Sequence, residues 1–208
     1  MKKINSILEY LDEIYPNVGC ELNYEKDYEL AIAVMLSAQT TDASVNRVTP
    51  ALFSAYPNIE SLAKADPNDI MKYINSLGLA RNKSKNIQAF ASKLVTDYNG
   101  KLPSDKNELI TFPGIGNKSA GVIRAEVFKI PDLPVDTHIL RISNRLQLTK
   151  SNNPDVVESD LKKLIEKEKW IKVHHQLIHF GRYFCTARNP KCKECKIKSC
   201  CKENKTNF

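Results

Sequence analysis

The sequence has no apolar run long enough to cross a membrane. Its longest apolar segment, residues 30–36, falls far short of the roughly 18–20 residues that a membrane-spanning helix needs, and it predicts a buried helix instead. The chain begins with Met1, Lys2 and Lys3, but neither the apolar core nor the small-residue cleavage site of a secretory signal follows. We therefore expect a protein of the reducing cytoplasm, bound to the nucleoid if the source is bacterial, that has no membrane partner.

Alternation of apolar and polar residues, the mark of half-buried strands, is scarce in this sequence. Apolar residues recur instead with helical spacing, and the chain is predicted to be all-α. Helices are expected over residues 4–15, 26–37, 41–56, 84–98, 104–112, 117–128, 136–147, 154–166 and 170–180, with a further helix that starts at Pro67 behind the N-cap Asp66. We expect Ser104 to cap the short helix over 104–112 and the pair Asn99-Gly100 to end the helix over 84–98.

Acidic residues are fewer than basic ones, with 24 Asp and Glu against 31 Lys and Arg, which gives a net charge of +7. An excess of this sign favours a polyanionic partner, because each phosphate that a cation neutralises releases condensed counterions. Charge alone does not identify that partner, since many basic proteins bind no nucleic acid.

Cysteine is nearly absent from the first 184 residues, where only Cys20 occurs, and the other five cysteines lie in the last 24 residues. In a reducing compartment this pattern predicts metal ligands rather than disulfides. Paired Cys-x2-Cys motifs would indicate structural zinc, but the segment has a single such pair, Cys192 and Cys195. Its unequal spacings favour an iron–sulfur cluster, while zinc or free thiols stay open. Cys20 is expected to be a small buried hydrophobic residue.

The segment Phe112-Pro113-Gly114-Ile115-Gly116-Asn117-Lys118-Ser119-Ala120 carries the strongest signal in the chain. Gly114 and Gly116 can adopt φ > 0 and let a ligand approach the backbone closely. Their N–H groups, next to the start of a helix, would form a phosphate site. Phe112 and Ile115 are expected to point inward and hold the turn.

Two nucleotide-binding motifs with similar glycines do not fit this segment. A phosphate-binding loop of the Walker type needs Gly directly before Lys-Ser, but Asn117 stands there. The dinucleotide fingerprint needs a third glycine where Ser119 stands. A corner between two helices without any ligand stays open as an alternative.

Together with residues 36–42 (LSAQTTD), residues 134–138 (PVDTH) and the C-terminal cysteines, this glycine segment resembles the endonuclease III family of helix–hairpin–helix DNA glycosylases and abasic-site (AP) lyases. The resemblance extends over nearly the whole chain. It implies a two-lobed fold with a C-terminal iron–sulfur cluster loop. One lobe would be a six-helix barrel over residues 20–130, with its helix–hairpin–helix at about 105–128. Residues 1–19 and 131–208 would form the cluster domain, and DNA would lie across the cleft between the lobes.

The resemblance implies that a [4Fe–4S] cluster is bound by Cys185, Cys192, Cys195 and Cys201. The neighbouring Cys200 would shorten the last spacing from five residues to four, and the family spacing selects Cys201. Lysines alternate with these cysteines, so that a stiffened loop would present a basic surface to phosphate.

The implied activity is base-excision DNA repair, in which the enzyme removes oxidised or otherwise damaged pyrimidines from double-stranded DNA and then cuts the abasic site. Lys118 would attack the sugar C1′, form a Schiff base and allow β-elimination of the 3′ phosphate. Only a neutral amine attacks, and partial desolvation of Lys118 and the positive end of a helix are expected to favour that form. An isolated lysine is more often a solvated cation or a phosphate contact.

Asp136 would assist the nucleophile and stabilise the positive charge that develops on the sugar, facing Lys118 from the other lobe. An aspartate before a helix that starts at Thr137 is also an ordinary N-cap, and the two roles are compatible. Which proton Asp136 moves stays open.

An enzyme that attacks C1′ within a duplex must extrude the nucleotide, and other side chains then fill the stack. The resemblance assigns this insertion to Gln39 and Leu79, and it assigns further DNA contacts to Gly114, Gly116, Asn117 and His138. His138 could equally pack inside the protein. The basic residues that follow Leu79, Lys83 among them, are either phosphate contacts or a solvated helix start. We expect a monomer.

Two other functions compete with this interpretation. Adenine-mismatch glycosylases of the same superfamily typically lack the hairpin lysine and carry a catalytic glutamate in the helix before the Gln39 turn. This chain has Lys118, and that helix has no carboxylate after Glu29. A non-enzymatic DNA-binding module with a structural metal would leave the Lys118–Asp136 pair without a role. Asn117 replaces the arginine that is frequent in the family, and Gln176 replaces a common tryptophan, which leaves the range of lesions open.

Overall fold

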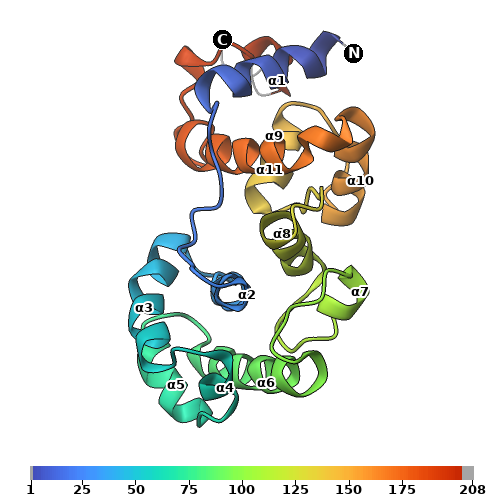
Figure 1. Cartoon of the computed structure of the whole chain (residues 1–208). Coiled ribbons are helices and arrows are strands. Elements are labelled where there is room, and N and C mark those ends of the chain that lie inside the picture. The colour runs from blue at the N-terminus through green and yellow to red at the C-terminus, as the bar shows by residue number, and fades with distance from the viewer. Residues whose placement is uncertain (1, 203–208) are drawn as a thin grey trace. The chain divides into compact units, whose positions relative to one another are not determined.

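A computed structural model of the chain describes residues 2–202, and every regular element within that range is helical, as the sequence predicts (Figure 1). None of these helices is long and apolar enough to span a membrane. The chain divides into two compact units, Glu21–Ile130 and Met1–Cys20 with Pro131–Phe208. The C-terminal residues 203–208 lie outside the described range.

The unit Glu21–Ile130 contains seven α-helices within the described residues, where six were predicted. They are α2 (Asp27–Leu36), α3 (Asp42–Ala55), α4 (Ile59–Ala63), α5 (Pro67–Ile74), α6 (Ala80–Tyr98), α7 (Lys106–Leu109) and α8 (Asn117–Val127). The additional helix is α4, whose five residues are too few to give a periodic pattern. The Asn58 side chain caps α4 by accepting a hydrogen bond from the Ser61 N–H at 2.8 Å.

Helix α2 forms the centre of this unit. Its residues from Glu29 to Leu36 are all buried, so that apolar side chains cover the whole circumference of the helix. It packs against α8, α3 and α6. A capping box stabilises its start, where the Glu29 carboxylate accepts hydrogen bonds from the N–H groups of Glu25 and Lys26.

Helix α6 begins at Ala80, four residues earlier than predicted, because the residue before it, Leu79, has an unusual backbone conformation. Leu79 occupies the left-handed region with φ +62°, and its carbonyl accepts hydrogen bonds from the N–H groups of Asn82 and Lys83. Leucine rarely adopts this conformation, so no sequence rule signalled a helix start here. The helix ends at Asn99 and Gly100, both left-handed, as the sequence predicts.

The other unit joins the N-terminal helix to the part of the chain that begins at Pro131 (Figure 1). Its α-helices are α1 (Lys2–Ile14), α9 (Thr137–Arg145), α10 (Pro154–Leu164) and α11 (Trp170–His179). A short helical turn, Lys167–Lys169, precedes α11, and three more follow it at Phe180–Phe184, Cys192–Glu194 and Lys198–Cys200. Helix α1 lies beside the segment Cys192–Glu194 and the residues just after it, since the Tyr10 hydroxyl donates to the Glu194 carbonyl and Lys196 pairs with Glu13.

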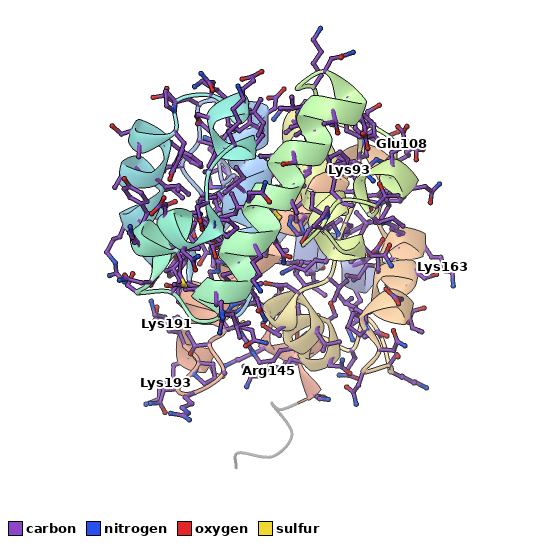
Figure 2. All side chains as sticks on the ribbon, turned by 90° about the horizontal axis from the view of Figure 1, so that it is seen from below. Lys93, Glu108, Arg145, Lys163, Lys191 and Lys193 are labelled. Carbon is purple, nitrogen blue, oxygen red and sulfur yellow. The ribbon has the colours of Figure 1, made fainter. Side chains whose placement is uncertain are left out.

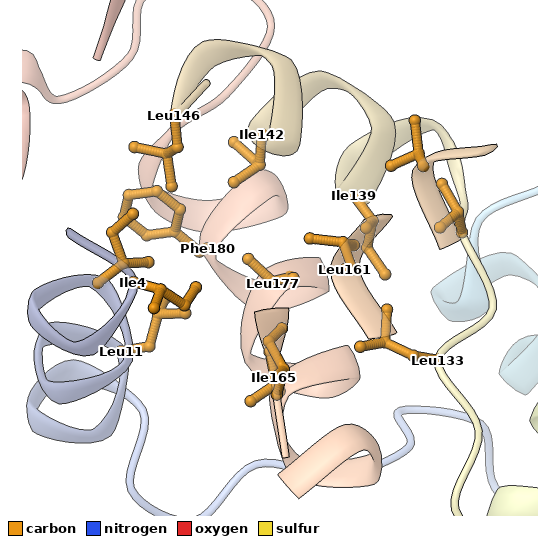
Figure 3. Packing of buried hydrophobic residues seen from close by; sticks show 14 of the residues in the cluster. Ile4, Leu11, Leu133, Ile139, Ile142, Leu146, Leu161, Ile165, Leu177 and Phe180 are labelled. Carbon is orange, nitrogen blue, oxygen red and sulfur yellow. The ribbon is translucent and has the colours of Figure 1, made fainter. Parts of the chain in front are cut away.

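Apolar side chains from four helices form the core of this unit (Figure 3). The same cluster contains Ile4 and Leu11 of α1, Ile142 of α9, Leu161 of α10 and Leu177 of α11. Burial of one such side chain contributes about 1.5–3 kcal/mol, so this core holds α1 against α9, α10 and α11.

Side-chain caps set the starts of several helices. Asp136 caps α9 by accepting a hydrogen bond from the Ile139 N–H at 2.7 Å, as predicted. The predicted cap of α7, Ser104, is wrong. Asp105 instead accepts hydrogen bonds from the N–H groups of Asn107 and Glu108. A carboxylate offers a charged acceptor at the positive end of a helix, which a hydroxyl does not.

The turn between α7 and α8 is fixed by apolar packing and by one glycine. Phe112 and Ile115 are buried, as predicted, and the Phe112 ring packs against those of Phe90 and Tyr98. Gly114 has φ +82°, and a Cβ at this position would lie 2.8 Å from Met35 Sδ and 3.1 Å from Asn86 Cβ. Both the backbone conformation and the lack of space therefore require glycine here.

We predict that Gly114→Ala destabilises the protein by about 1–3 kcal/mol, through left-handed strain and displacement of Met35. Thermal unfolding followed by circular dichroism measures the change. Gly78→Ala is the matched control, because Gly78 has open space around it and should change stability by less than about 0.5 kcal/mol. Equal melting temperatures for the two variants would contradict this account of the turn.

Candidate nucleic-acid interface and cysteine loop

The N-terminal turn of α8 is open to solvent. Gly116 is its N-cap and Asn117 its first residue, and both are exposed together with Lys118. Gly116 has φ −101°, so the left-handed conformation predicted for both glycines occurs only at Gly114. No atom lies within 4 Å of a Cβ built on Gly116, which leaves the N–H groups of this helix start accessible to a ligand.

Lys118 is exposed, whereas partial burial of its side chain was predicted. The amine is therefore accessible, and its place in the first turn of α8 puts it at the positive end of the helix dipole.

Gln39 and Leu79 share two unusual properties. Both are left-handed, with φ +55° and +62°, and both are exposed. Leu79, at 53% exposure, is the most exposed of the large apolar residues in the described part of the chain. Strained backbone and an apolar side chain in water both cost free energy, and such costs concentrate at functional sites.

Lys83 departs most from the sequence prediction. It was expected to be either a solvated residue at the helix start or an exposed phosphate contact, and it is neither. It is 5% exposed, and its Nζ donates to Thr40 Oγ1 at 2.9 Å. Burial lowers the pKa of the Lys83 amine. The Thr40 hydroxyl lies directly after Gln39 in the chain.

Asp136 is partly buried, and its Oδ1 is engaged in the cap of α9. His138 is partly buried in the next turn, where Arg141 Nη2 lies 3.4 Å from its Nδ1. Burial lowers the pKa of His138, and the charge of Asp136 opposes this shift. A Cβ on Gly181 would lie 2.9 Å from His138 Cβ, so His138 packs closely against the turn before the cysteine loop.

Cys185 follows a π-helical turn, Phe180–Phe184, and its N–H bonds the carbonyl of Phe180 at 2.6 Å. Two arginines of α9 hold this segment. Arg141 donates to the carbonyl oxygens of Gly181 and Cys185, and Arg145 donates to Thr186 O at 2.7 Å and to Cys185 Sγ at 3.4 Å.

Neighbouring cysteines act electrostatically on two thiols of the loop. Burial raises the pKa of the Cys185 thiol, which Arg145 opposes and Cys201 reinforces. Burial also raises the pKa of Cys195, and the charges of Cys185, Cys192 and Cys201 add to this shift. Within residues 2–202, no three Cys, His, Asp or Glu side chains are gathered closely enough to hold a single metal ion.

Lysines surround this loop. Lys191 and Lys193 are exposed and their side chains point away from the ribbon in Figure 2. Lys196 and Lys198 are also exposed, so the cysteine loop presents a basic surface.

Sequence reasoning missed the buried contact of Lys83 and the roles of Arg141 and Arg145. The two arginines are four residues apart on α9, a spacing that places them on one helix face and that could have indicated a shared contact. No comparable signal exists for Lys83, because a lysine in the first turn of a helix is ordinarily solvated.

Comparisons with known proteins identify the family of this chain. Residues 32–167 match the model of the HhH-GPD superfamily base excision DNA repair proteins. Endonuclease III of Bacillus subtilis is 41% identical over 98% of this chain and 93% of its own length.

Two solved structures are similar over nearly their whole length. A non-covalent endonuclease III–DNA complex has a TM-score of 0.95 at 40% identity, over 98% of this chain and 96% of that one. A trapped endonuclease III–DNA covalent intermediate has a TM-score of 0.94 at the same identity and coverage. The chain thus belongs to the endonuclease III family within the HhH-GPD superfamily of base excision DNA repair proteins.

Proposed function

We propose that this base excision repair enzyme removes damaged pyrimidines from double-stranded DNA and cleaves the resulting abasic site through a covalent intermediate on Lys118. The observation that carries the proposal is an exposed lysine in the open first turn of α8. An amine there can reach a sugar while the N–H groups of the same turn bind the adjacent phosphate. The trapped covalent complex of a 40% identical endonuclease III supports the same chemistry.

The reaction follows from a nucleophilic amine. Lys118 Nζ forms a bond to C1′ as the bond from C1′ to the base breaks, and the base leaves with a proton. Opening of the sugar ring gives a protonated Schiff base, which acidifies the C2′ hydrogen. Loss of that proton expels the 3′ phosphate by β-elimination, and water then releases the lysine.

We assign to Asp136 the stabilisation of positive charge on the sugar. Its Oδ1 is fixed by the Ile139 N–H, so the carboxylate has a defined orientation and Oδ2 can accept a further bond. A charge held in place before the reaction contributes more than one that must reorganise.

Gln39 and Leu79 are proposed to enter the base stack when the nucleotide is extruded. The apolar side chain of Leu79 would separate bases, and the amide of Gln39 would bond the orphaned partner base. Their exposure and left-handed backbone support this role. Gly114 and Asn117 belong to the phosphate-binding turn, and His138 stays a proposed phosphate contact, which its packing against Gly181 restricts.

We further propose that Cys185, Cys192, Cys195 and Cys201 bind a [4Fe–4S] cluster. Each thiolate would bind a separate iron, so the ligands need not converge on one ion. The charge of Cys201 raises the pKa of both Cys185 and Cys195, and the charge of Cys192 also raises that of Cys195, which supports this set. The cluster would stiffen the loop and hold its lysines toward phosphate. We expect the enzyme to act as a monomer in the cytoplasm.

The first test concerns the nucleophile. Borohydride added during incubation with a duplex that contains thymine glycol or an abasic site should reduce the Schiff base to a stable protein–DNA adduct. We expect Lys118→Ala to lower adduct formation at least about a hundredfold. Lys101→Ala, at an exposed position in the same unit, should form the adduct at the wild-type rate.

Wild-type release of the base without trapping would indicate a mismatch-type glycosylase, and binding without release would indicate a DNA-binding module. Either result would contradict the proposed lyase.

The second test concerns the open turn. Gly116→Ser places a side chain where phosphate is proposed to approach, while serine is a good N-cap and has no strain at φ −101°. We expect an unchanged melting temperature and an affinity for duplex DNA that is weaker by about fivefold or more. Fluorescence anisotropy measures the affinity, and unchanged binding would refute the phosphate role of this turn.

The third test separates two adjacent cysteines. Cys201→Ser should lose most of the bound iron and the yellow-brown colour, because one iron loses its thiolate. Cys200→Ser should keep both. Iron per chain, measured by elemental analysis of protein purified without oxygen, decides between them, and the reverse pattern would assign the ligand to Cys200.

A further inference from the structure

Lys83 carries a cost that neither the fold nor the proposed reaction accounts for. It is 5% exposed, burial lowers the pKa of its amine, and within residues 2–202 no carboxylate forms an ion pair with it. A buried cation without a counter-ion is unfavourable, and an apolar side chain of similar length would fill the same space at lower cost. This cost directs attention to the polar contact that the Lys83 amine makes with Thr40.

That contact joins two segments that are far apart in the sequence. The Lys83 Nζ donates to Thr40 Oγ1, and the Thr40 hydroxyl donates in turn to the carbonyl of Ala38 at 3.3 Å. The acceptor carbonyl and the hydroxyl lie on either side of Gln39. The chain of hydrogen bonds therefore spans Gln39 and opposes any relaxation of its left-handed backbone.

The backbone of the same lysine engages the second left-handed residue. The Lys83 N–H donates to the carbonyl of Leu79 at 3.0 Å and so helps to close the first turn of α6. One residue thus contacts both strained turns, through its side chain at one and its backbone at the other.

We propose that Lys83 is a positioning residue that fixes the Gln39 turn on the first turn of α6, so that Gln39 and Leu79 enter DNA as one rigid unit. This inference rests on the DNA-inserting role of both residues in the proposed function. Rigidity matters because ordering two mobile side chains upon binding would cost affinity for extruded nucleotides. Binding to undamaged DNA, which needs no insertion, does not depend on Lys83.

The test compares two affinities. Anisotropy gives the dissociation constants for a duplex with a tetrahydrofuran abasic-site analogue and for the same duplex without it. The preference for the analogue is the dissociation constant for the undamaged duplex divided by that for the analogue duplex. We expect Lys83→Met to lower this ratio about tenfold. The affinity for undamaged DNA and its salt dependence should stay unchanged. The melting temperature should be equal or higher, because the variant removes a buried charge.

Thr40→Val provides a second route, since it removes the acceptor hydroxyl without changing charge. It should lower the ratio to a similar extent, and the double variant should be no worse than Lys83→Met alone, because both changes break one interaction. Lys64→Met removes a charge from an exposed position of the same unit and should leave the ratio unchanged.

Other outcomes overturn the inference. Equal weakening on both duplexes, with a salt slope that is smaller by about 1, would make Lys83 a phosphate contact instead. An unchanged ratio in Lys83→Met would refute the positioning role. The proposed function would still stand if the wild-type protein prefers the analogue duplex. If the wild type itself shows no preference, the proposed function fails first.

Discussion

The proposed chemistry depends on how Gly114 is held between α2 and α6. Its φ of +82° turns the chain sharply, and Met35 and Asn86 leave no space for a side chain. Because Phe112 and Ile115 are buried on either side, the turn has little freedom to relax. The start of α8 is consequently fixed with its N–H groups and Lys118 open to solvent. A conformational constraint in the core thereby fixes both the exposed turn that we propose as the phosphate site and an accessible amine.

Helix α6 also contacts the two other turns that are proposed to touch DNA. Leu79 precedes its first residue, Lys83 reaches the turn that contains Gln39, and Asn86 packs on the glycine turn. The spacing of these positions, four and three residues apart, places them on one face of the helix. One rigid element therefore carries contacts to all three proposed DNA-binding segments of this unit. Strain at Gln39 and Leu79 is tolerated because the surrounding structure determines both conformations.

Much of this could be predicted from the sequence, and the reasons differ by feature. The all-α class, the long helices and the Asp136 cap follow from local patterns that the structure confirms. Helix α4 was missed because five residues give no periodicity, and the start of α6 was missed because left-handed leucine has no sequence signature. The predicted cap Ser104 is wrong because its neighbour Asp105, also a good N-cap residue, occupies that position. The buried state of Lys83 and the exposed state of Lys118 depend on tertiary packing, which no local pattern contains.

The central claim is that the amine of Lys118 forms the covalent bond to the sugar. Digestion of the borohydride-reduced wild-type adduct, followed by tandem mass spectrometry, identifies the modified residue without any substitution. The account predicts that the reduced sugar is attached to Lys118 alone. Attachment to another amine, the buried Lys83 among them, would contradict it.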